Sequence, residues 1–156
     1  MADRLLPVAD AATIAACEKE YLSLAAHGGG ETAEACFRYA WALCHSANAA
    51  ENKRGIALSE EAESHNMEGR KGSDITSREF MYIRAVGLFK AGSYNAARQV
   101  CREILEESPD CRQAGTLKEI VEDTMIREGL FGVGVAAAGV ATVVVGGLIA
   151  ALARKR

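Results

Sequence analysis

The side chains of this sequence that could do chemistry are its five cysteines and three histidines. Cys44 and His45 are adjacent, and a thiol beside an imidazole could act as a nucleophile with its general base. Adjacent residues on a helix point about 100° apart, however, and no third group that could orient the imidazole is evident in the sequence. We therefore predict that this pair is not catalytic.

The spacing of the same residues does not match a metal site or a disulfide framework. The cysteines are odd in number and form no C-x-x-C pair, and the histidines are scattered. Reduced core thiols in a cytosolic domain are the expectation that remains. Without paired carboxylates or a phosphate-binding loop, the sequence predicts no catalytic residues, no metal, no cofactor and no enzymatic activity. The residues concerned are Cys17, Cys36, Cys44, Cys101, Cys111, His27, His45 and His65.

The charge of the chain is unevenly distributed. Its 18 Lys and Arg residues include the last three positions, Arg154, Lys155 and Arg156, so residues 1–128 carry a net charge of −6. An acidic segment without a basic stripe is typical of proteins that do not bind nucleic acids. The length of this segment is that of one ordinary domain with its own core.

Apolar residues recur at helical spacing through residues 10–128, and strand-like alternation is scarce. Start and stop signals divide this region: Gly28-Gly29-Gly30 ends the first helix, the capping box Thr76-x-x-Glu79 begins the fourth, and Pro109 ends the fifth. Residues 65–73 are predicted to form a solvated loop. The sequence thus predicts an all-α bundle of six helices, at about 10–27, 32–46, 51–64, 76–91, 93–108 and 110–128.

Two segments carry the spacing of tetratricopeptide (TPR) repeats, antiparallel helix pairs that pack through small residues. Phe80–Pro109 has the required residues, and Phe37–Ala62 is a degenerate copy with Trp41 as its aromatic anchor and Gly55 at the small position. Two such pairs, with one helix on each side, predict a TPR-like bundle whose concave face is lined by the second and fourth helices. We expect Phe37 and Trp41 to be core residues. The residues of Phe80–Pro109 that match the repeat are Ala85, Gly92, Tyr94, Ala97 and Pro109.

Residues 129–153 carry no charge, and three basic residues follow them. A helix of this length rises about 37 Å, enough to cross a hydrocarbon core of about 30 Å. Residues 1–8 do not resemble a signal or transit peptide, so we expect a cytosolic N-terminal domain and a basic tail on the far side of the membrane. The segment is only weakly hydrophobic, because it consists mostly of Gly, Ala and Val. This composition favours the outer mitochondrial or the peroxisomal membrane. A stripe of small residues either lets two copies pair or arises by chance: Gly134, Ala138, Thr142, Gly146 and Ala150.

Six short motifs run in order along nearly the whole chain: Phe37-Arg-Tyr-Ala-Trp41, Lys53-Arg54-Gly55-Ile56, Ala85-Val86-Gly87, Tyr94-Asn-Ala-Ala97, Glu107-Ser-Pro109 and Glu128-Gly129-Leu130-Phe131-Gly132. In these motifs the chain resembles the mitochondrial fission 1 family, tail-anchored, TPR-like adaptors of the outer mitochondrial and peroxisomal membranes. The resemblance implies a domain without catalytic activity that docks a dynamin-related GTPase, directly or through other adaptors, for the division of mitochondria and peroxisomes.

The resemblance also implies a partner-binding groove on the concave face. Arg84 stands where the family usually has an apolar residue, so it either pairs with an acidic group of the partner or points to solvent. Met1–Val8 would form an arm that lies over the groove. The expected domains are an arm at 1–9, the bundle at 10–128, a transmembrane anchor at 129–153 and a basic targeting tail at 154–156. The groove maps onto Leu43, Arg84, Ala85, Leu88 and Lys90.

A second class of function fits the same architecture, a tail-anchored TPR receptor for chaperones or precursor proteins. A receptor that clamps a C-terminal carboxylate needs several Lys, Arg and Asn side chains that converge on the groove. Arg84 and Lys90 are the candidates here, and they do not make a convincing set. The adaptor is therefore the preferred interpretation, and the receptor is the alternative.

Overall fold

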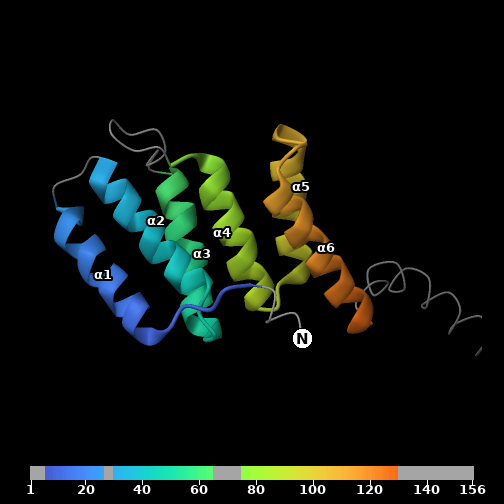
Figure 1. Ribbon diagram of the computed structural model, residues 1–156, viewed down its shortest axis with the longest axis horizontal. Coiled ribbons are helices and arrows are strands. Elements are labelled where there is room, and N and C mark those ends of the chain that lie inside the picture. Colours follow the sequence, from blue (N-terminus) through green and yellow to red (C-terminus); the bar gives the residue numbers. More distant parts are fainter. Residues whose placement is uncertain (1–5, 27–29, 65–74, 130–156) are drawn as a thin grey trace, which may run out of the picture. The chain divides into compact units, whose positions relative to one another are not determined.

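The computed structural model describes residues 6–26, 30–64 and 75–129. Within these ranges the chain is all-α, and its six helices match the six expected from the sequence (Figure 1). The chain divides into two compact units, residues 1–121 and residues 122–156, and the packing described below lies within the first. The helices are α1 (Ala11–Ala25), α2 (Gly30–Cys44), α3 (Ala49–Ser64), α4 (Ser77–Lys90), α5 (Tyr94–Glu107) and α6 (Arg112–Arg127).

The ends of several helices follow local signals of the sequence. Asp10 caps α1, because its Oδ1 accepts a hydrogen bond from the N–H of Thr13 at 2.7 Å. The predicted capping box opens α4, where the Glu79 carboxylate accepts the N–H of Thr76 at 2.7 Å. Gly92 follows α4 with a φ of +79°, a conformation that favours glycine and allows the turn into α5.

Two helices begin earlier than predicted. α2 begins two residues before Thr32, because the hydroxyl of Thr32 donates to Leu24 O at 3.0 Å, in the last turn of α1, instead of capping α2. α3 begins directly after Asn48 rather than near Glu51. The reason is that Asn48 Oδ1 accepts the N–H of Ala50 at 2.9 Å, which makes Asn48 the cap.

Consecutive helices of the first unit lie side by side (Figure 1): α1 packs on α2, α2 on α3, α3 on α4, and α4 on α5. α2 also contacts α4, so the first helices of the two predicted repeats are neighbours. This is the arrangement expected for two TPR-like pairs, α2–α3 and α4–α5. It places α2 and α4 along one face, as the sequence predicted.

Helices α2, α3 and α4 meet closely around the thiol of Cys44. A Cβ atom added at Gly55 would lie 2.7 Å from Cys44 Sγ and 2.8 Å from Cys44 N, and one at Gly87 would lie 2.8 Å from the same Sγ. Gly55 therefore occupies the small position that the sequence predicted, and Gly87 has the same role beside the fully buried Ala85. Burial raises the pKa of the Cys44 thiol to about 12, so this thiol is a core group rather than a nucleophile.

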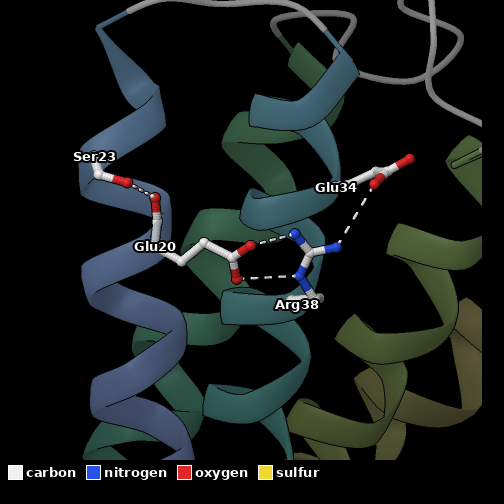
Figure 2. A network of polar contacts seen from close by, with 4 residues as sticks. All are labelled: Glu20, Ser23, Glu34 and Arg38. Atoms are coloured by element: carbon white, nitrogen blue, oxygen red, sulfur yellow. Dashed lines mark hydrogen bonds and ion pairs between the residues drawn. The ribbon is translucent and has the colours of Figure 1, made fainter.

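An exposed charged network joins α1 to α2. Figure 2 shows Arg38 of α2 between Glu20 of α1, at 2.7 Å, and Glu34 of its own helix, at 3.6 Å. The hydroxyl of Ser23 donates to the backbone oxygen of Glu20 at 2.7 Å. The ion-paired side chains are nearly half exposed, so each pair stabilises the fold by at most about 1 kcal/mol. The close packing of α2, α3 and α4 around Cys44 therefore stabilises the bundle more than this network does.

Candidate docking groove

A cavity of about 520 Å³ lies between α2, α4 and the start of α6, a volume typical of binding pockets. α2 contributes two aromatic side chains, the first turns of α4 contribute four residues, and the α5–α6 turn with the start of α6 completes the wall. The lining residues are Phe37, Trp41, Arg78, Glu79, Tyr82, Ile83, Asp110, Cys111, Arg112 and Gln113.

A second cavity, of about 310 Å³, adjoins the first and shares Tyr82, Arg112 and Gln113 with it. We call the two cavities together the concave groove. The first cavity is its charged end, and the second is its apolar end, since the residues added there are mostly apolar. They are Leu6, Pro7, Thr116, Leu117 and Ile120.

Backbone contacts of Ala9 hold the N-terminal segment beside this groove. The N–H of Ala9 donates to His45 O at 3.1 Å, and Ala9 forms an isolated parallel bridge with Ser46. From this tie at the end of α2, the chain places Leu6 and Pro7 in the wall of the second cavity. The described part of the segment thus lies beside the concave groove, residues 1–5 lie outside the described residues, and the arm stays a prediction.

Phe37 and Trp41 have two roles. The Phe37 ring meets Phe80 edge-to-face with centroids 5.5 Å apart, and Trp41 stacks on His45 at 4.2 Å. Both side chains pack against a core cluster, as predicted, yet both are only partly buried and also line the larger cavity. The prediction that they are core residues was therefore incomplete.

The five residues that the sequence assigned to partner binding do not line the concave groove. Leu43 and Ala85 are 1% and 0% exposed, and Leu43 belongs to a core cluster with residues of α1 and α2. Leu88 is partly buried in α4. A fully buried side chain cannot touch a partner without a rearrangement of the core, so Leu43 and Ala85 shape this face from within. A binding role for these residues stays a prediction.

Arg84 and Lys90 make contacts within the fold. The guanidinium of Arg84 pairs with Glu63 of α3, and the two side chains are 14% and 22% exposed. Arg84 thus has an ion-pair partner within the fold, an arrangement that the sequence analysis did not consider, and its role toward a partner protein stays a prediction. Lys90 Nζ donates to His45 O at 3.2 Å, the same carbonyl that holds Ala9. Both side chains therefore fix α4 against neighbouring elements.

The stability of the bundle should decrease below neutral pH because of His45. This side chain is 2% exposed, its Nδ1 lies 2.8 Å from Trp41 O, and burial, aided by the charge of Lys90, lowers the pKa of the imidazole. Between that lowered pKa and about 6.5, the unfolded chain binds a proton that the folded chain does not, so the free energy of unfolding falls with falling pH.

We expect the urea midpoint of unfolding to fall between pH 7.5 and pH 5.5, and His45→Phe to reduce this dependence. The same slope in the wild-type chain and in His45→Phe would show that His45 is not the group responsible.

Comparison with known proteins decides the family. Residues 34–62 match the model of the Fis1 N-terminal tetratricopeptide repeat, and residues 78–130 match that of the Fis1 C-terminal tetratricopeptide repeat. Mitochondrial fission 1 protein A of Arabidopsis thaliana is 32% identical over 154 residues, which cover 97% of this chain and 88% of the relative. The chain belongs to the mitochondrial fission 1 family. Mitochondrial fission 1 protein B of the same plant is 34% identical over 148 residues, with 95% and 83% covered.

Solved structures of Fis1 proteins share the fold. The crystal structure of yeast Fis1 in complex with an Mdv1 fragment matches with a TM-score of 0.59 and 24% identity, over 83% of this chain and 94% of that chain. The solution structure of yeast Fis1 matches with a TM-score of 0.59 and 25% identity, over 81% of each chain. Members of the mitochondrial fission 1 family are non-enzymatic adaptors. Family membership therefore confirms both the resemblance found in the motifs and the prediction that the chain is not an enzyme.

Proposed function

We propose that this protein is an adaptor of the outer mitochondrial membrane, and also of the peroxisomal membrane, that docks division machinery for organelle fission. The docked protein is a dynamin-related GTPase or one of its adaptors. The observation that carries the proposal is the larger cavity of the concave groove, about 520 Å³ with an aromatic wall, in a chain of the mitochondrial fission 1 family. A complex of yeast Fis1 with an Mdv1 fragment supports it, because that protein has the same fold.

The proposal includes an arrangement at the membrane. Among residues 6–26, 30–64 and 75–129, no helix is long and apolar enough to cross a membrane. The predicted anchor at 129–153 lies, except for Gly129, outside the described residues, as does the basic tail at 154–156. The proposal of a tail anchor with residues 1–128 in the cytosol rests on the length and lack of charge of that segment. Pairing of two copies through Gly134, Ala138, Thr142, Gly146 and Ala150 stays a prediction.

The alternative, a TPR receptor that clamps a C-terminal carboxylate, is weakened by the contacts of its two candidate side chains. Arg84 is paired with Glu63, and Lys90 donates to His45 O. A clamp needs cationic groups that are directed at the ligand. We therefore retain the fission adaptor as the proposed function.

The proposed function predicts a change in organelle length. Depletion of the protein in its own cells should elongate both mitochondria and peroxisomes, scored separately by microscopy. The intact chain should restore normal length, and a chain that ends at Glu128 should not, because it lacks the proposed anchor. Unchanged organelle length after complete depletion would contradict a role in fission.

A further inference from the structure

The concave groove carries two arginines at its charged end. Arg78 and Arg112 line the larger cavity beside its aromatic wall. Arg78 Nη1 has one long contact, at 3.5 Å, with the hydroxyl of Ser108. Arg112 is exposed, and within the described part of the chain its side chain has no hydrogen-bond or ion-pair partner. Both guanidinium groups are thus accessible to a group that enters the cavity.

Two carboxylates line the same cavity, and their surroundings differ. Glu79 is engaged in the cap of α4, where its carboxylate accepts the N–H and the hydroxyl of Thr76 at 2.7 and 3.0 Å. Asp110 is exposed in the α5–α6 turn. The cavity therefore presents two guanidinium groups against the carboxylate of Asp110. The formal charges of the four side chains cancel, but the Glu79 carboxylate is engaged by Thr76, whereas both guanidinium groups are accessible to a ligand.

The wall beside these charges is aromatic, from Phe37, Trp41 and Tyr82. Aromatic pockets take apolar anchor residues, and charges at the edge of such a pocket select among partners by electrostatic complementarity. We propose that the groove selects a partner segment that carries an acidic residue within one helical turn of an apolar anchor, with its carboxylate paired to Arg112. The inference rests on the proposed docking function and specifies the chemistry of the docked segment.

Trp41 provides a probe for this test, since it is the only tryptophan in the sequence and lines the cavity. Three helical peptides of about 12 residues, free of tryptophan, would be titrated into the full chain in detergent solution. They share one Phe anchor and differ only at the position four residues away, which lies on the same helix face and is Glu, Gln or Lys.

We expect the Glu peptide to change the Trp41 emission with a dissociation constant about fivefold below that of the Gln peptide, and the Lys peptide to bind more weakly still. The preference for Glu should disappear in Arg112→Gln and increase in Asp110→Asn. Arg102→Gln is the matched control, because Arg102 is an exposed arginine of α5 that does not line the groove.

Equal affinities for the three peptides, or a preference for Lys, would overturn the proposal. So would an emission that responds to none of them, or one that changes with protein concentration alone, because a second copy of the chain would then fill the groove. None of these results would contradict the proposed function, since organelle length tests it without reference to the charge of the partner.

Discussion

Asn52→Asp should lower the free energy of unfolding by about 3–5 kcal/mol, the cost of leaving a charge buried without a partner. Asn52 is 1% exposed, and its Nδ2 donates to Leu43 O at 3.0 Å, Cys44 O at 3.3 Å and Ser46 O at 3.0 Å. Leu43 and Cys44 stand in the last turn of α2, whose carbonyls lack partners within the helix, and Ser46 follows the helix end. An aspartate would direct a carboxylate oxygen at all three carbonyls.

Equilibrium unfolding in urea, followed by circular dichroism at neutral pH, measures this loss. The matched control is Asn48→Asp, because Asn48 is exposed and caps α3 as an acceptor, a role that aspartate fills equally well. Its stability should stay within about 0.5 kcal/mol of the wild-type chain. Similar losses in the two variants would show that the buried amide does not hold the end of α2.

Gly55→Ala should destabilise the bundle by about 3 kcal/mol, at the upper end of overpacking effects. The new methyl group would lie 2.8 Å from the backbone N of Cys44 and 2.9 Å from Leu43 Cβ, so α2 and α3 would have to separate. At Gly87 the atoms in the way belong to side chains, Cys44 Sγ at 2.8 Å and Ile56 Cγ1 at 3.0 Å. Gly87→Ala is therefore the variant that a second substitution can rescue.

Double-mutant cycles with Cys44→Ala distinguish the cause of the stability loss at Gly55 from that at Gly87. Cys44→Ala should recover at least half of the stability lost in Gly87→Ala and little of that lost in Gly55→Ala, as measured by urea unfolding. Gly115→Ala is the control, because nothing lies within 4 Å of an added Cβ there, and it should stabilise α6 slightly. Equal recovery in both backgrounds would show that the thiol, and not the backbone of α2, sets the distance between α2 and α3.

The sequence predicted those features of the fold that depend on neighbours along the chain. The capping box at Thr76, the turn at Gly92 and the small residue at Gly55 are local or periodic signals, and the structure confirms each of them. The cap at Asn48 was missed because the polarity of α3 gave a weak periodic pattern. The ion pair of Arg84 could not be predicted, because its partner Glu63 lies on another helix.

The residues that line the concave groove were not among those that the sequence analysis assigned to partner binding. The resemblance to the family placed Leu43 in the groove, and packing of α1 against α2 buries this side chain in the core. The residues that do line the groove share a helical spacing: Arg78 and Tyr82 at i and i+4, and Gln113, Thr116 and Ile120 at i, i+3 and i+7. This spacing is visible in the sequence, but which helices face one another follows only from the fold.

The concave groove is central to the proposed function, and filling it tests that role most directly. Gln113 and Thr116 are exposed residues of α6 that line the groove, so Gln113→Trp with Thr116→Trp should block it without disturbing the core. The control is Asn95→Trp with Gln99→Trp, two exposed residues of α5 that do not line it.

Both double variants would be expressed at equal levels in cells depleted of the protein, with circular dichroism as a check of their helix content. We predict that mitochondria stay elongated with the blocked groove and regain normal length with the α5 control. Normal length with the blocked groove would contradict docking at this site.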